Sequence, residues 1–324
     1  MLLEYSIRQD NEMNMTNING KNVLVTGGAG FIGSHLCKRL LSLNCNIVVV
    51  DNFSSSQNHN ELNKDIILIE LDITKSDHIE KLFKDYSFDI VFHLAAIANP
   101  RTCKENFGLA FNVNVIGTKN ILLHSNNCDK VVFMSSAAVY GEPIKIPIGE
   151  DHPLNGNDPY AITKIIGEKL CVNFAKNYLY NIVIIRNFNT FGIGQTGDYI
   201  IPTLIYQALV NRTIEIWNST PIRDMMYIDD TIDALITVTN KSGPGLEIYN
   251  IGSGRGIQIG QLADIIRHYI GEEIRVIDLQ KPVVGSYKLI ADSSKLIGLG
   301  WKETVGFEEG IRRTIQWFKT KIRV

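Results

Sequence analysis

The stretch VTGGAGFIGSHL, residues 25–36, decides the fold that the sequence predicts. It continues an apolar run that begins at Asn22, and its second half has the pattern of a helix. Gly27 allows a tight turn, Gly30 lets the backbone approach a pyrophosphate, and Gly33 permits close packing of the helix on the strand. The amino end of the helix then faces the phosphates. In this context the glycines predict a dinucleotide-binding turn; the alternative is an ordinary strand-to-helix turn with incidental glycines.

The second apolar run, residues 46–51, ends in an acid that bears on the cofactor. Asp51 lies 18 residues after Gly33, near the spacing expected for a carboxylate that binds ribose. Such a carboxylate accepts a hydrogen bond from the 2′-hydroxyl and repels a 2′-phosphate. No arginine occurs within residues 51–57, so NAD is expected rather than NADP. Asp72, at the end of the third run, either caps the adenine edge or simply closes a strand.

The first half of the chain alternates β-branched runs with helical patterns. Strands are expected at residues 22–27, 46–51, 66–72, 89–96, 130–136 and 181–187. Helices are expected between them, for example at residues 31–43 and 78–86. Nearly continuous apolar runs are typical of strands that are covered on both faces. The predicted fold class is therefore α/β, with a doubly wound parallel Rossmann sheet.

Beyond Arg186 the pattern loosens and predicts a smaller C-terminal α+β lobe that binds the substrate. We expect a loop at residues 189–199, helices at 201–211, 258–270 and 308–322, and a strand at 273–280. The predicted organisation begins with a flexible N-terminal extension at residues 1–19. A dinucleotide-binding domain follows at residues 20–190, together with roughly 224–250. The lobe consists of residues 191–223 and 251–324. The ligand cleft is expected at the carboxyl ends of the strands.

Composition excludes several classes of protein. Apolar residues make up 45% of the 324 residues, charged residues make up 20%, and the net charge is −2, which is typical of a soluble globular protein. This balance argues against a nucleic-acid binder and against a basic membrane-binding module. No apolar run approaches the roughly 20 residues of a spanning helix, and the amino end does not resemble a signal peptide. The five scattered cysteines, without a CxxC pair, indicate reduced thiols rather than a metal site, so a cytoplasmic protein without metal is expected.

A tyrosine and a lysine share one face of the helix that PYAITK opens. Tyr160 and Lys164 are four residues apart. A tyrosine hydroxyl titrates near about pH 10, and a nearby ammonium and a positive nicotinamide both favour the phenolate. The pair therefore predicts a catalytic base, although taken alone it is also typical of a surface helix whose lysine reaches into water.

Two hydroxyls in MSSAAVYG, residues 134–141, end the fifth predicted strand. Read together with Tyr160 and Lys164, Ser136 is expected to complete a hydride-transfer site. Ser135 is expected to be structural and to bond to the backbone at the strand end.

The motifs together resemble a known family. TGGAGFIG, DNFSSS, LDI, HLAA, NVNVIGT, MSSAAVYG, PYAITK, NFNTFG, RDMMYIDD and YNIGSG occur in family order and cover about residue 20 to the C-terminus. This set resembles the extended short-chain dehydrogenase/reductases, and among them the NAD-dependent nucleotide-sugar epimerases and dehydratases, in particular those of the UDP-glucose 4-epimerase type. The set is much more specific for the family than for the substrate.

The resemblance implies a role for each matching residue. Ser136 would be the catalytic hydroxyl, Tyr160 the base, and Lys164 its partner on the nicotinamide ribose. The resemblance implies an NAD site formed by Gly27, Gly30, Phe31, Ile32, Gly33, Asp51, Asn52, Asp72, Ile73, Leu94, Ala95, Ala96, Tyr160 and Lys164. Asn189 and Arg223 would contact the nucleotide-sugar together with Ser136 and Tyr160, with Arg223 on a phosphate.

Two of these assignments have structural alternatives, and one family feature is missing. Asn189 is equally typical of a loop-capping amide, and Arg223–Asp224 of a surface ion pair. Many relatives carry an RPGD-like segment whose arginine binds the substrate pyrophosphate, but residues 280–295 read QKPVVGSYKLIADSSK. Lys281 or Lys288 offers a point charge there without bidentate geometry.

The residues after Ser136 bear on the reaction. The dehydratase branch carries an Asp–Glu pair there, which removes an α-proton and protonates the leaving hydroxyl. This chain has Ala137 and Ala138, which can do neither. The resemblance therefore favours a nucleotide-sugar 4-epimerase that oxidises C4 transiently and returns the hydride to the other face.

The sequence leaves two other functions open. An NAD(P)-dependent 4-keto-sugar reductase would use the same residues, and a non-catalytic dinucleotide sensor would need none of them.

The expected substrate is a nucleotide-diphosphate sugar, with UDP-sugars first, and no nucleic acid or membrane partner is expected. The family commonly forms homodimers through a four-helix bundle, here residues 119–125 and 164–178, although these helices also cover the sheet.

Overall fold

The computed structural model describes residues 17–54, 62–178, 180–197, 199–283 and 285–322. Nearly all of the predicted flexible extension at residues 1–19 lies outside these ranges, as does part of the DNFSSS motif.

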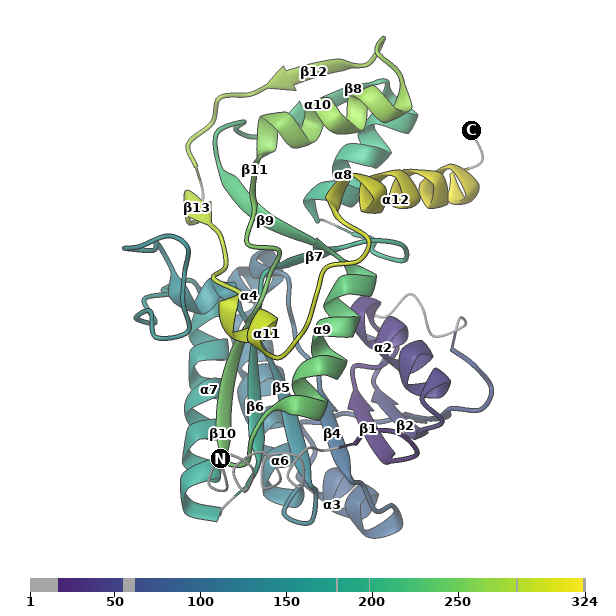
Figure 1. The fold of residues 1–324 in the computed structure, drawn as a ribbon, viewed down its shortest axis with the longest axis vertical. Coiled ribbons are helices and arrows are strands. Elements are labelled where there is room, and N and C mark those ends of the chain that lie inside the picture. Colours follow the sequence, from purple (N-terminus) through teal and green to yellow (C-terminus); the bar gives the residue numbers. More distant parts are fainter. Residues whose placement is uncertain (1–16, 55–61, 179, 198, 284, 323–324) are drawn as a thin grey trace, which may run out of the picture.

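A parallel seven-stranded sheet forms the larger part of the molecule (Figure 1). Its order is β10-β6-β5-β4-β1-β2-β3, and every neighbouring pair is parallel. The strands are β1 (Asn22–Thr26), β2 (Asn46–Asp51), β3 (Ile67–Glu70), β4 (Ile90–His93), β5 (Lys130–Ser136), β6 (Ile182–Asn187) and β10 (Leu246–Ile251). The order reverses between β1 and β4, as in a doubly wound fold, so the predicted fold class is confirmed.

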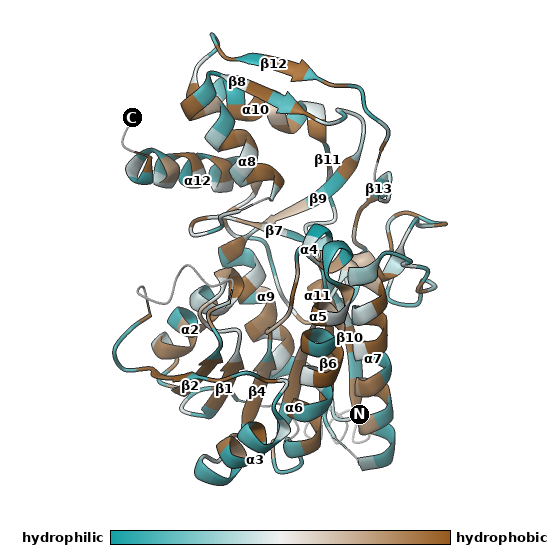
Figure 2. Ribbon diagram, turned by 180° about the vertical axis from the view of Figure 1, so that it is seen from behind, coloured by the Kyte–Doolittle hydropathy of each residue, from teal (hydrophilic) through white to brown (hydrophobic). Residues whose placement is uncertain are grey.

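Helices cover both faces of this sheet. Val23 and Val25 of β1 belong to one apolar core, with α2 (Phe31–Ser42) and α9 (Ile228–Lys241). Leu24 between them belongs to a second core, with α3 (Ser76–Asp85), α6 (Thr118–His124) and α7 (Pro159–Tyr178). Successive side chains of a strand point to opposite faces, so a sheet covered twice must be apolar throughout. The strands are accordingly coloured as hydrophobic in Figure 2.

The carboxyl-terminal half adds two smaller sheets beyond the carboxyl ends of the large one (Figure 1). One contains β7 (Asn189–Phe191), β9 (Ile222–Tyr227), β11 (Gly256–Gln258) and β13 (Lys288–Leu289), and the other contains β8 (Thr213–Ile216) and β12 (Arg275–Asp278). The accompanying helices are α8 (Ile200–Tyr206), α10 (Ile259–Ile270), α11 (Ser294–Gly298) and α12 (Phe307–Lys321). Short connecting helices are α4 (Pro100–Glu105), α5 (Phe107–Phe111), η2 (Asn112–Gly117), η3 (Ala137–Tyr140) and η4 (Gln207–Asn211).

One local prediction is wrong. Residues 189–199 were expected to form a loop, but Asn189–Phe191 is strand β7, which pairs in parallel with Met225–Tyr227 of β9. The glycines at 192, 194 and 197 dominate the local pattern, whereas the strand depends on a partner 36 residues further along the chain. Such long-range pairing leaves no periodic signal in so short a segment.

The described residues contain no helix that is both long and apolar enough to cross a bilayer. All five cysteines are free thiols; Cys128 is half-buried and the other four are buried.

Candidate active site

The glycine turn between β1 and α2 leaves no room for a side chain at positions 27 and 33. Gly27 has φ +71°, and a Cβ placed on it would lie 2.7 Å from the backbone nitrogen of Ala95. A Cβ on Gly33 would lie 2.3 Å from the carbonyl oxygen of Gly27. Gly30 is the N-cap of α2, followed by the half-buried Phe31 and Ile32 as its first residues. The first amides of α2 therefore have no capping side chain, which is the arrangement that accepts a phosphate.

We predict that Gly33→Ala opens this turn. The added methyl group meets backbone atoms that cannot move without displacing α2 from β1, so the free energy of unfolding should fall by about 1–3 kcal/mol. Affinity for NAD should fall with it, and both are measured by urea denaturation and by titration with NAD. Gly298→Ala in α11 is the control, because a Cβ there has no heavy atom within 4 Å. Equal behaviour of the two variants would contradict the role of the turn.

Asp51 at the end of β2 is tied to the glycine turn. Its Oδ2 accepts a hydrogen bond from the backbone nitrogen of Ala29 at 3.1 Å, and its Oδ1 accepts one from Phe53 at 2.9 Å. The side chain of the next residue, Asn52, is turned to its own loop, where its Oδ1 accepts hydrogen bonds from both the backbone and the hydroxyl of Ser54. The carboxylate thus has a fixed direction beside the amino end of α2.

The other predicted cofactor residues follow β3 and β4 at the same edge of the sheet. Asp72 closes a turn, because its Oδ1 accepts from the backbone nitrogen of Thr74 at 2.9 Å, and Ile73 is buried against Gly117. Residues 94–96, which are Leu94, Ala95 and Ala96, are half-buried. The structure therefore brings the carboxyl ends of β1, β2, β3 and β4 together as the sheet order requires.

A buried histidine, which the sequence analysis missed, holds the end of β4. Its Nδ1 lies 2.7 Å from the hydroxyl of Thr26, and its Nε2 lies 2.9 Å from the hydroxyl of Thr118. Thr118 donates to the carbonyl of Asn114, so it accepts from Nε2 of His93, and Thr26 then donates to Nδ1. Burial, with the charge of Lys164 as a smaller cause, lowers the pKa of His93 to about 3. This neutral imidazole fixes Thr26, whose hydroxyl accepts from the amide of Ala95.

Ser136 and Tyr160 meet at the carboxyl end of β5. The hydroxyl of Ser136 accepts a hydrogen bond from the backbone nitrogen of Ala138 at 3.2 Å. Burial raises the pKa of Tyr160, and the nearby hydroxyl of Ser136 opposes this effect. The phenol is therefore protonated at neutral pH until further positive charge arrives. Ala137 is buried and Ala138 is half-buried beside the pair.

Lys164 lies one turn along α7 but faces the sheet. Its Nζ donates to the carbonyl of Met134 at 2.8 Å and lies 5.9 Å from the centroid of the Tyr160 ring. Burial lowers the pKa of Lys164 to about 8. The ammonium of Lys164 therefore lies near the ring of Tyr160, on the side of α7 that faces the sheet.

Ser135 is buried, as a structural role requires, but the backbone partner expected for it is wrong. Its hydroxyl donates to Oε1 of Glu168 at 2.6 Å, not to the backbone at the strand end. Glu168 also pairs with Arg186, with 2.9 Å between Nη2 and Oε2. The sequence did hold a signal for Glu168, since it follows Lys164 by four residues on the face that carries Tyr160. A carboxylate on a buried helix face needs a partner, so its position alone indicated a polar cluster.

Asn114 holds the loop after β4 against α7. Its side chain accepts from the backbone nitrogen of Ile97 at 2.8 Å and donates to the carbonyl of the same residue at 3.0 Å. It also donates to the hydroxyl of Thr163, which in turn donates to the carbonyl of Tyr160. The start of α7 is therefore tied to the segment that follows β4.

The predicted substrate residues lie on the neighbouring strands β7 and β9. The amide of Asn189 donates to the carbonyl of Asp224 at 3.1 Å, and Arg223 donates through Nη1 to the carbonyls of Ile222 and Tyr287. Burial lowers the pKa of Arg223, and the charge of Glu142 opposes this.

The surface ion-pair alternative for Arg223 and Asp224 is wrong. Asp224 is fully buried, and its carboxylate accepts from the backbone nitrogens of Ser253, Gly254 and Ala291. Neighbouring residues of a strand face opposite ways, so the two side chains serve different sides of β9.

The two lysines near the missing arginine have different surroundings in the structure. Nζ of Lys281 lies 4.3 Å from the centroid of the Trp217 ring. In the register of β13 with β9, Leu289 rather than Lys288 lies opposite Arg223.

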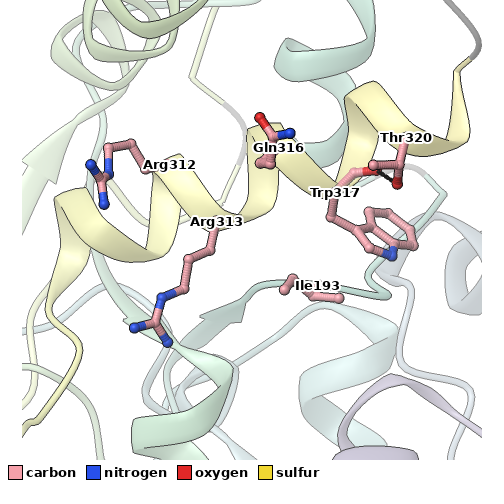
Figure 3. Close-up of a pocket in the computed structure, with 6 residues that line it drawn as sticks. All are labelled: Ile193, Arg312, Arg313, Gln316, Trp317 and Thr320. Atoms are coloured by element: carbon pink, nitrogen blue, oxygen red, sulfur yellow. Dashed lines mark hydrogen bonds between the residues drawn. The ribbon is translucent and has the colours of Figure 1, made fainter.

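A separate hollow lies along α12 (Figure 3). Arg313 and Trp317 extend from the side of the helix that faces Ile193. Arg312, Gln316 and Thr320 complete its lining, and none of the predicted site residues borders it. The hollow is therefore distinct from the predicted site at the strand ends.

Comparison with known proteins decides the family. Residues 23–252 match the NAD dependent epimerase/dehydratase family. The chain belongs to this family. This membership confirms the family predicted from the motifs, and relatives in it carry out both reactions that the family name contains.

Relatives and a solved structure illustrate this range. The chain is 36% identical over 312 residues to the putative UDP-glucose 4-epimerase of Methanocaldococcus jannaschii. The aligned region covers 93% of this chain and 99% of that protein. The chain is 31% identical over 319 residues to human dTDP-D-glucose 4,6-dehydratase, over 92% of this chain and 90% of the other. The UDP-glucose 4-epimerase of Thermotoga maritima, solved with UDP-glucose, matches with a TM-score of 0.89 at 29% identity, over 93% and 99% of the two chains. The site residues must therefore distinguish the reactions that this family performs.

Proposed function

We propose that this family member is a nucleotide-sugar 4-epimerase that uses NAD. The observation that carries the proposal is the composition of the site around Ser136 and Tyr160. The hydroxyl of Ser136 at the end of β5 is near enough to the phenol of Tyr160 to lower its pKa, and the two residues after Ser136 are alanines. A dehydratase needs acid and base groups for a second proton transfer, and Ala137 and Ala138 offer none.

The cofactor-side residues suit NAD. The uncapped amino end of α2 suits a pyrophosphate, and Gly27 and Gly33 leave space that a Cβ would fill. The carboxylate of Asp51 suits a ribose 2′-hydroxyl and disfavours a 2′-phosphate. Leu94, Ala95 and Ala96 would line the cleft on the β4 side. When bound, NAD supplies a hydride acceptor for sugar C4 and a hydride donor for its opposite face.

The side chains of the chain itself would handle the proton. Tyr160 as phenolate removes the proton from the 4-hydroxyl, and Ser136 donates a hydrogen bond to the same oxygen. Lys164 supplies positive charge one turn below, which favours the phenolate against the effect of burial. The 4-keto sugar then turns in the site so that its other face can accept the hydride. Tyr160 returns the proton to the oxygen on C4. The residues end in their starting protonation states, and because the hydride taken from C4 is returned, no net redox change occurs.

The substrate side favours a nucleotide-diphosphate sugar. Arg223 is half-buried with its guanidinium held by two carbonyls, and its charge suits a pyrophosphate. Asn189 would contact the sugar nucleotide from the adjacent strand. A UDP-sugar is the first choice, because the solved structure from Thermotoga maritima is a complex with UDP-glucose.

The deciding experiment is incubation of the purified protein with a panel of UDP-, dTDP- and GDP-sugars without added cofactor. NMR should show a C4 epimer of at least one UDP-sugar, and the purified protein should contain bound NAD. A protein that purifies without nicotinamide and consumes NADH stoichiometrically with a 4-keto sugar is a reductase instead. Formation of a 4-keto-6-deoxy sugar would contradict the argument from the two alanines.

Homodimerisation also remains a prediction. The helices on the α7 side of the sheet expose large apolar side chains, namely Phe107, Leu109, Leu123 and Ile162, which are 36–44% exposed. Exposed apolar side chains on adjoining helices are typical of a helical interface between subunits.

A further inference from the structure

Five buried polar side chains close in sequence or space to Ser136 and α7 are joined by hydrogen bonds. They are Ser135, Tyr140, Glu168, Arg186 and Asn250, each at most 3% exposed. We refer to these five residues as the buried cluster. They come from β5, η3, α7, β6 and β10, so they connect the catalytic helix to three neighbouring strands.

Glu168 links α7 to both strands next to it. Its Oε1 accepts from the hydroxyl of Ser135 at 2.6 Å and from Nε of Arg186 at 3.1 Å, and its Oε2 accepts from Nη2 at 2.9 Å. Ser135 and Arg186 are opposite each other in the β5–β6 register. The carboxylate of Glu168 therefore bonds to side chains at paired positions of β5 and β6. These bonds fix the position of α7 along the direction of the two strands.

These paired positions are next to the reacting groups. Tyr160, Lys164 and Glu168 are spaced by one helical turn each and lie on one face of α7. Ser135 precedes Ser136 directly. Rotation or sliding of α7 by a fraction of a turn would separate the phenol of Tyr160 from the hydroxyl of Ser136, and Glu168 opposes such movement.

The far end of the cluster holds the chain on the other side of Ser136. Tyr140 ends the short helix η3 that Ser136 caps, and its hydroxyl donates to Oδ1 of Asn250 at 2.6 Å. Nη1 of Arg186 donates to the same hydroxyl at 3.1 Å. The segment that carries Ser136 is thus held before and after that residue by one connected set of hydrogen bonds.

We propose that the buried cluster is a positioning device, in which Glu168 sets the distance between the phenol of Tyr160 and the hydroxyl of Ser136. The inference rests on the function proposed above, because it assigns Glu168 to the same proton transfer. Glu168 touches neither substrate nor cofactor and acts only through α7 and β5. A small displacement of reacting groups is enough to slow a reaction strongly.

The test compares Glu168→Gln with a matched variant elsewhere. The amide keeps the shape of Glu168 but loses the charge that holds Arg186, so kcat should fall about 10- to 100-fold while KM stays within about twofold. Asp230→Asn is the control, because Asp230 is also a fully buried carboxylate, bonded to the amides of Thr304, Val305 and Gly306 at the start of α12. It should lower the melting temperature and leave kcat unchanged.

A second variant covers the case in which Glu168→Gln does not fold. Ser135→Ala removes one hydrogen bond from Glu168 and leaves the ion pair with Arg186 intact. It should reduce kcat about three- to tenfold, and Ser135→Thr, which keeps the hydroxyl, should restore it. A kcat that is equal in the alanine and threonine variants would overturn the positioning role.

Titration of Tyr160 gives a readout that does not need a substrate. The ultraviolet phenolate band of each protein is recorded against pH, and that of its Tyr160→Phe counterpart is subtracted. Lys164, Tyr199, Cys103 and Asp158 are the other titratable groups near the phenol, and all are retained. Loss of the Ser136 contact should move the titration of Tyr160 to higher pH in Glu168→Gln.

The outcomes separate the two proposals. If the wild-type protein converts no nucleotide-sugar, the proposed function fails by itself, and the cluster is judged on the titration alone. If Glu168→Gln loses stability as Asp230→Asn does, with kcat and the Tyr160 titration unchanged, the cluster is structural and the positioning role is overturned.

Discussion

Tyr160→Phe is expected to reduce kcat for epimerisation by about 10³-fold and to leave KM within about threefold. The hydroxyl is the only group in the proposed mechanism that removes and returns the proton, and loss of a positioned acid–base group typically costs 10²- to 10⁴-fold. The phenyl ring still fills the same space, so the fold and the NAD content should not change. The measurement is a steady-state assay of C4 epimer formation, with NAD quantified after release from the protein.

Tyr178→Phe is the matched control for this variant. Tyr178 is the last residue of the same helix and is 59% exposed, so its hydroxyl has no place in the proposed site. It should retain wild-type kcat. Epimerisation by Tyr160→Phe at more than a tenth of the wild-type rate would contradict the assignment of Tyr160 as the base.

Lys164→Met is expected to stabilise the cofactor-free protein at neutral pH while it lowers kcat about 10²-fold. Burial lowers the pKa of Lys164 from 10.5 to about 8. The folded state therefore holds the ammonium less readily than the unfolded chain does. The difference corresponds to about 3 kcal/mol of destabilisation at pH 7, which methionine would remove.

The sign of the effect sets its pH dependence. Because the folded pKa is the lower one, the cost is present in full below about pH 8 and decreases as the pH rises towards 10.5. Urea denaturation should therefore show a more stable Lys164→Met at pH 7 and nearly equal proteins at pH 10.5. Lys169→Met, at an exposed position of α7, should show no such difference. A Lys164→Met protein that is less stable at pH 7 would show that the bond to Met134 outweighs the burial of charge.

The sequence predicted those features that depend on local pattern. Six apolar runs became six parallel strands, and the glycine spacing predicted a turn in which Gly33 touches the backbone of Gly27. Strand β7 escaped because its pairing with β9 is non-local. The partners of Ser135 and Asp224 escaped for a related reason, since the direction of a buried side chain depends on helices and loops that only the fold brings near. Glu168 could have been predicted as a buried polar residue, because helical spacing alone places it one turn after Lys164 on the same face of α7.

Strand β10 has a consequence for how this molecule is assembled. It completes the large sheet beside β6, yet it follows β7, β8 and β9 in the chain. During synthesis, β6 therefore presents an unpaired edge for some sixty residues, from Asn187 until Leu246 arrives. Unpaired edges are templates for aggregation. The pairing of β10 with β6 ends this exposure of β6, so the large sheet is complete only after β7, β8 and β9 have been synthesised.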